Sequence, residues 1–151
     1  MATTKGRIKA ISISKDRGTK KYNVPTAELK AGFGIEGDAH AGNWHRQVSL
    51  LGEESIEKMK AKGADVTKGD FAENITTEGI DLQSLTIGSK LRLGTEAEIE
   101  IAQFGKKCHS DCAIFQQVGD CIMPREGVFA KVIRPGKVKT GDTIEVLKSY
   151  D

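Results

Sequence analysis

The sequence lacks the long apolar runs and the charge imbalance that mark membrane proteins and nucleic-acid-binding proteins. No apolar run approaches the roughly 20 residues of a membrane-spanning helix, and the N-terminus, MATTKGRIKAISISK, has neither a long apolar core nor a small-residue cleavage site. The 23 lysines and arginines nearly balance 21 acidic residues, which leaves a formal net charge of +2. Partners such as nucleic acids and membranes usually require a basic block. We therefore expect a cytoplasmic protein with neither kind of partner.

Internal repeats, low-complexity segments and obvious linkers are also absent. The 17 glycines are spread along the chain instead of gathering in one stretch. A length of 151 residues suits one domain with a sizeable core. The composition, 38% hydrophobic and 29% charged, argues against disorder. We predict a single domain over residues 1–151, with its oligomeric state left open.

Short alternating segments between the glycines predict a mainly β fold. The clearest is GSKLRLG, residues 88–94, in which apolar and polar residues alternate between two glycines. Lys139 to Asp142 is typical of a turn between late strands. The predicted strands cover residues 7–14, 47–51, 88–94, 98–101, 128–133 and 143–147. Many short strands with few helices favour a closed or nearly closed β-barrel.

Helical signals are fewer. The residues from Glu53 to Lys62 have acids in the first turn and lysines in the last, and Gly63 follows as a C-terminal cap. This pattern predicts a helix. A second short helix is predicted to begin near Pro25, whose fixed φ suits a first helical turn. Residues 111–118 fit more than one kind of element.

Cysteine is scarce, and all three cysteines lie in GKKCHSDCAIFQQVGDC, residues 105–121, which we call the thiol segment. An odd number of thiols in a reducing compartment makes a structural disulfide the least favoured role. A zinc site could use Cys108, His109, Cys112 and Cys121. However, Cys-x3-Cys is looser than the usual zinc spacing, and no second cysteine pair exists. Three small buried thiols without chemistry remain an alternative.

Two of the cysteines have neighbours that favour a reactive thiolate. A thiolate forms near neutral pH when positive charge or a helix N-terminus lowers the thiol pKa. Lys106 and Lys107 precede Cys108, and His109 follows it. If residues 111–118 form a short helix, Cys112 lies in its first turn, where backbone N–H groups favour negative charge. Cys121 has a less activating neighbourhood, and we expect it to be a packed thiol.

Three stretches of the chain resemble the MOSC domain family, which is named for the C-terminal domain of molybdenum cofactor sulfurase. They are GIEGDAHAGNWHRQVSLLGEESIEKM (34–59), GDFAENITTEGIDLQSLTIGSKLRLG (69–94) and the residues from 105 to 147. The stretches follow one another in the family's order with no missing block. GDFAENI and the closing V-x-x-GD-x-I are the most characteristic parts.

The resemblance implies a fold and a function. The fold is a mainly β, MOSC-type β-barrel, similar to the barrel domain of pyruvate kinase, with a few short helices. The function is to hold a molybdenum cofactor, or a persulfide sulfur, on a cysteine thiolate. Such a module would pass its cargo to a molybdoenzyme or to a cofactor-biosynthesis protein.

Two other functions remain open. One is a small molybdenum-dependent reductase of N-hydroxylated compounds, and the other is a structural zinc module or plain barrel without a cofactor. Sulfurases also have a pyridoxal-phosphate domain, and amidoxime-reducing members have an additional N-terminal β-barrel domain. This sequence contains neither, so we do not expect it to bind pyridoxal phosphate. The lack of extra domains favours the carrier over the reductase.

The resemblance also implies the site residues. Cys112-Ala113-Ile114 is similar to the ligand cysteine of amidoxime-reducing members, and Lys107-Cys108 is similar to the Pro-Cys form of many others. We favour Cys112 as the molybdenum ligand and catalytic thiolate, with Cys108 as the alternative. Each cofactor-binding candidate could instead be a solvated surface charge or a turn residue. These candidates are His40, His45, Arg46, Glu73, Asn74, Lys106, Lys107, His109, Arg125 and Glu126.

Overall fold

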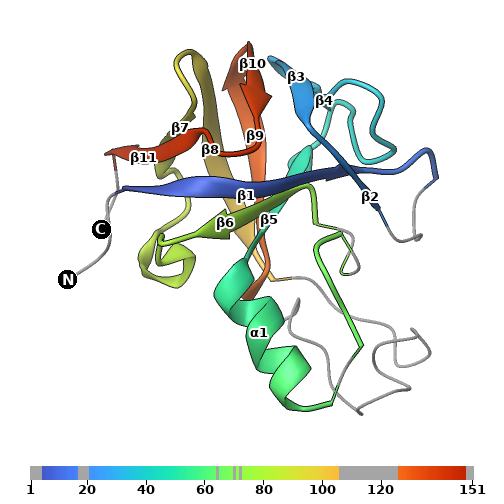
Figure 1. The fold of residues 1–151 in the computed structure, drawn as a ribbon. Helices are drawn as coiled ribbons and strands as arrows, with labels where there is room; N and C mark the ends of the chain where they lie inside the picture. Colours follow the sequence, from blue (N-terminus) through green and yellow to red (C-terminus); the bar gives the residue numbers. More distant parts are fainter. Residues whose placement is uncertain are drawn as a thin grey trace.

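The computed structural model describes residues 5–16, 21–63, 65–69, 71, 73–105 and 126–148 (Figure 1). Strands dominate these residues, and one α-helix and one short 3-10 helix accompany them. The elements in chain order are β1 (Lys5–Ile13), β2 (Tyr22–Val24), β3 (Thr26–Lys30), β4 (Gly34–Ile35), β5 (Val48–Gly52), α1 (Glu53–Ala61), β6 (Ile75–Glu78), the 3-10 helix (Leu82–Ser84), β7 (Lys90–Leu93), β8 (Ala97–Phe104), β9 (Val128–Arg134), β10 (Gly136–Lys139) and β11 (Thr143–Lys148).

Seven of the described strands close into a barrel in the order β1, β11, β7, β8, β9, β5, β6 and back to β1. β5 and β6 run parallel, and the other neighbours in this barrel are antiparallel. Closure depends on β1 and β11, where Lys5 pairs with Glu145. The predicted mainly β barrel is therefore confirmed. Of its seven strands, only β6 had no predicted counterpart, because ITTE is short and does not alternate in hydrophobicity.

Aliphatic side chains fill the barrel interior. Leu50, Ile75 and Ile99 are among those with no exposed surface. Ile8 and Ile11 of β1 both join this core although they are three residues apart. The register of β1 against β6 shifts between Ile8 and Ala10. Because a bulge of this kind adds one residue to a strand, it explains the imperfect alternation of the β1 sequence.

Helix α1 packs against β5 and β6 outside the barrel (Figure 1). It ends one residue earlier than predicted, with Lys62 as its C-cap. Gly63 follows with φ 98°, a conformation that favours glycine, and its N–H donates to Lys60 O. Ile56 and Met59 are buried on the face toward the sheet. No helix in the described part of the chain is long and apolar enough to span a membrane.

The helix predicted near Pro25 is wrong. Pro25 stands at a bend between β2 and β3. β3 instead pairs antiparallel with β10, with Leu29 opposite Gly136, and also with β4. The partner strand is more than 100 residues away in sequence, so local propensity is overridden by a pairing that no short window shows. The other uncertain segment, residues 111–118, lies outside the described residues.

Candidate functional site

The connection between β8 and β9 carries the thiol segment, and the structure describes where this connection begins and ends. At the barrel, Phe104 pairs with Val128, and Gly105 N donates to Gly127 O at 2.7 Å. Several predicted site residues lie between these points and outside the described residues, so their roles stay predictions. They are Lys106, Lys107, Cys108, His109, Cys112 and Arg125.

His45 lies on the loop before β5 and contacts the end of β8. Its Nε2 lies 2.7 Å from Gln103 Oε1, and Gln103 Nε2 donates to Gly105 O at 2.7 Å. The second contact fixes the orientation of the Gln103 amide, so Oε1 faces the imidazole. Because an amide oxygen only accepts, His45 Nε2 carries a proton. His45 therefore holds the strand that leads into the thiol segment.

Arg46 lies beside β8 and β9, the two strands that the thiol segment connects. Its guanidinium carbon is 4.7 Å from the Trp44 ring centroid and 5.9 Å from that of Phe129, both within cation–π range. Phe129 is paired with Gln103 across β8 and β9. Arg46 Nε is buried and has no hydrogen-bond partner among the described residues. Buried donors are normally satisfied, so this orphan N–H marks a place where an acceptor is expected.

His40 rests on a buried ion pair. Lys21 Nζ lies 2.7 Å from Asp38 Oδ1, and neither side chain has exposed surface. The same ammonium donates to Ser14 Oγ at 3.1 Å and lies 2.9 Å from His40 Nδ1. Since an ammonium only donates, Nδ1 accepts and is unprotonated. Sequence reasoning missed Lys21, because one lysine in a charged stretch gives no signal of burial.

Asn74 ties three strands together. Its Oδ1 accepts from Ser49 N at 2.9 Å, and its Nδ2 donates to Ser12 O at 3.1 Å. Its backbone N–H donates to Ser49 O, and its carbonyl accepts from Ser12 N. The side chain is fully buried. These contacts join β1, β5 and the start of β6, and a contact with a cofactor stays a prediction for this residue.

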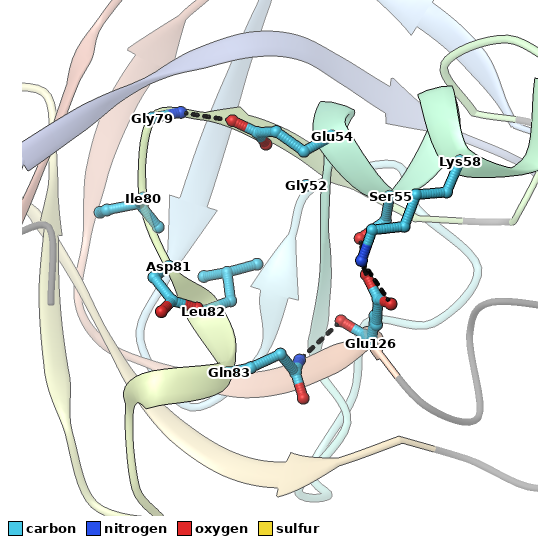
Figure 2. Close-up of a pocket in the computed structure, with 10 residues that line it drawn as sticks. All are labelled: Gly52, Glu54, Ser55, Lys58, Gly79, Ile80, Asp81, Leu82, Gln83 and Glu126. Atoms are coloured by element: carbon cyan, nitrogen blue, oxygen red, sulfur yellow. Dashed lines mark hydrogen bonds and ion pairs between the residues drawn. The ribbon is translucent and has the colours of Figure 1, made fainter.

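Glu126 lies at the end of the β8–β9 connection and contacts α1. Its carboxylate accepts from Ser55 Oγ, and Lys58 Nζ lies 3.0 Å from Oε2. Its backbone carbonyl accepts from Gln83 Nε2 at 3.0 Å. Figure 2 shows these side chains on one wall of an open pocket of about 680 Å³. The described lining is Gly52, Glu54, Ser55, Lys58, Gly79, Ile80, Asp81, Leu82, Gln83 and Glu126.

The pocket was not predicted from the sequence. Ser55 and Lys58 have the three-residue spacing of one helix face, which is as typical of a solvated face as of a binding site. Gln83 comes from the 3-10 helix, and only the fold brings it to the same wall (Figure 2). Glu54, also from the first turn of α1, lines the pocket near Gly79 and accepts a hydrogen bond from Gly79 N at 3.0 Å.

Comparison with known proteins assigns the chain to a family. The MOSC domain model matches residues 37–145, which include the 38–47 loop, α1 and the whole β8–β9 connection. The chain belongs to the MOSC domain family. This family is associated with molybdenum-cofactor and sulfur chemistry.

Solved structures share the fold of this MOSC chain. The YuaD protein from Bacillus subtilis is 22% identical, with a TM-score of 0.82 and 97% of each chain covered. YiiM from Geobacillus stearothermophilus is 19% identical, with a TM-score of 0.71, and the match covers 95% of this chain and 75% of that one. YiiM from Escherichia coli is 20% identical, with a TM-score of 0.67 and coverage of 96% and 71%. A search of curated proteins finds no match.

Glu73, in the characteristic GDFAENI stretch of the MOSC match, is a buried carboxyl. Its Oε2 accepts from Gly69 N and Thr76 Oγ1, each at 3.0 Å. Its Oε1 has no partner among the described residues. Burial raises the pKa of Glu73 above its ordinary value of 4.5, because desolvation outweighs these hydrogen bonds. A cofactor contact by Glu73 stays a prediction.

We expect Glu73→Gln to remove part of the pH dependence of stability. Folding raises the pKa of Glu73, so below pH 4.5 the carboxyl is protonated in both the folded and the unfolded state and does not lower the free energy of unfolding. The wild type loses stability as the pH rises from there through the raised pKa. The neutral amide has no such transition. Urea unfolding of both proteins at a series of pH values measures the difference. Exposed Glu57→Gln is the control, and equal pH slopes for Glu73→Gln and wild type would contradict the expectation.

No group of three or more His, Cys, Asp or Glu side chains in the described part of the MOSC domain is arranged to hold a metal ion. The ligands of the alternative zinc site, from Cys108 to Cys121, all lie outside that part. A structural zinc site therefore remains an alternative prediction for these residues. Among the cofactor-binding candidates, the structure brings His45, Arg46 and Glu126 to the ends of the β8–β9 connection.

Proposed function

We propose that this MOSC domain holds a molybdenum cofactor, or a sulfur atom as a persulfide, on a thiolate of the thiol segment. Its role would be to carry this cargo to a molybdoenzyme or a cofactor-biosynthesis protein. Arg46 is the observation that carries the proposal. Its Nε is a buried donor without a hydrogen-bond partner among the described residues, and its guanidinium lies beside β8 and β9, the strands from which the thiol segment departs.

The residues fit such a group by their chemistry. Cys112 or Cys108 supplies a soft thiolate, the ligand type suited to a soft metal centre or to sulfur transfer. Arg46 supplies N–H donors, which recognise the oxygens of a phosphate such as that on the pterin. His40 and the cations Lys106, Lys107, His109 and Arg125 are further candidates for the same anion. When bound, the metal would supply the redox or sulfur-transfer chemistry.

The protein's cargo can be measured directly. We expect anaerobically purified protein from a cofactor-competent host to contain molybdenum and pterin in near-equal amounts. If the cargo is sulfur, intact mass measurement should instead show one added sulfur atom that a reductant removes. Arg46→Met, which keeps an apolar stem against Trp44, should lower the molybdenum and pterin content. Folded wild type with neither cargo would refute the proposal and leave a structural module.

A further inference from the structure

We infer that His45 and Glu126 are positioning residues that clamp the two ends of the connection carrying the thiol segment. The inference rests on the proposed function in one respect, which is that this connection carries the working thiolate. It assigns His45 and Glu126 to holding the protein chain, whereas the sequence suggested that both bind the cofactor.

The first clamp holds the start of the connection. His45 donates from Nε2 to Gln103 Oε1, and the same amide donates to Gly105 O. Gly105 N is bound in turn to Gly127 O. Because His45 Nε2 donates its proton to the Gln103 side chain, this nitrogen binds the protein chain. The loop before β5 thereby fixes the last described residues before the cysteines.

The second clamp holds the end of the connection. Both oxygens of the Glu126 carboxylate are engaged by α1, Oε1 by Ser55 and Oε2 by Lys58. Gln83, from the 3-10 helix, donates to the Glu126 carbonyl on the same wall of the pocket (Figure 2). The Glu126 side chain is 21% exposed, whereas Lys58 is 60% exposed. The hydrogen bond from Ser55 is partly buried, whereas the ion pair with Lys58 is exposed. The Ser55 hydrogen bond should therefore contribute more to holding Glu126 than the Lys58 ion pair.

The clamps act on the connection from outside its own hairpin. β8 and β9 hold Phe104 against Val128, but His45 and α1 belong to other parts of the barrel. Local opening of a segment depends on the contacts that must break. Removing either clamp should therefore loosen the described ends of the connection, residues 103–105 and 126–128, without unfolding the barrel.

Hydrogen–deuterium exchange of the cofactor-free protein, read by mass spectrometry, tests the clamps. Glu126→Gln keeps the size of the side chain but removes its charge, and we expect peptides that cover the described ends of the connection, residues 103–105 and 126–128, to exchange about tenfold faster. His45→Ala should act in the same direction. Peptides of β5 and β11 and the unfolding midpoint should stay at their wild-type values. Lys60→Met is the matched control, because Lys60 on the same helix pairs only with the exposed Glu57 among the described contacts.

A charge exchange separates positioning from general weakening. Lys58→Glu combined with Glu126→Lys restores an ion pair of opposite polarity but removes the acceptor for Ser55, so we expect it to recover only the smaller share of the slow exchange that the Lys58 pair provides. Unchanged exchange in both Glu126→Gln and His45→Ala, in folded protein, would overturn the inference. In protein that retains molybdenum, Glu126→Gln should also speed cofactor release. Lack of any cargo would refute the proposed function and leave the exchange result standing.

Discussion

Replacing Cys112 with serine should reduce bound molybdenum to the background level, while Cys121→Ser should retain the wild-type content. Serine is isosteric with cysteine, but its hydroxyl stays protonated near neutral pH and offers a hard oxygen. A thiolate is both the nucleophile and the soft metal ligand. The loss should therefore be nearly complete. Metal and pterin analysis of anaerobically purified variants measures it.

The same experiment decides between the two candidate thiolates. Cys108→Ser should keep the cofactor if Cys112 is the ligand, because only one thiolate is needed in this role. The opposite result would assign the role to Cys108, whose neighbours Lys106, Lys107 and His109 also favour a thiolate. If both single variants and the wild type hold equal molybdenum, neither thiolate is its ligand. Persulfide analysis of the three variants gives the corresponding answer for a sulfur carrier.

Lys21→Met should destabilise the protein by about 3–5 kcal/mol, the usual cost of removing one partner from a buried ion pair. Methionine keeps much of the length of lysine but leaves the Asp38 carboxyl buried and without its cationic partner. It also removes the donor to His40 Nδ1 and to Ser14 Oγ. Urea unfolding at neutral pH measures the change in the free energy of unfolding.

Two further variants test whether the loss of stability comes from breaking the buried ion pair. Lys60→Met breaks an exposed ion pair and should cost no more than about 1 kcal/mol. Adding Asp38→Asn to Lys21→Met replaces the unpaired charge by a neutral amide and should recover part of the loss. A Lys21→Met protein as stable as the Lys60→Met control would show that the buried pair contributes little. The 38–47 loop would then need another support.

Most of the local elements, and the family, could be predicted from the sequence alone. Alternating or otherwise strand-like stretches predicted six of the seven barrel strands, and acids, lysines and Gly63 predicted α1 almost to the residue. These signals are predictable because periodicity and helix caps depend on neighbours only a few residues apart. The MOSC assignment came from stretches that follow one another in order, and the family match over residues 37–145 confirmed it.

Features that depend on distant partners became evident only in the folded chain. Pro25 stands between two strands because β3 pairs with β10, and Lys21 is buried because Asp38, seventeen positions away, lies against it. Glu126 is fastened by Ser55, which is 71 positions away. No local pattern encodes such contacts, since each depends on how the closed barrel brings remote segments together. The sequence therefore predicts a role for the thiols, whereas the described contacts at the two ends of their connection could be seen only in the folded chain.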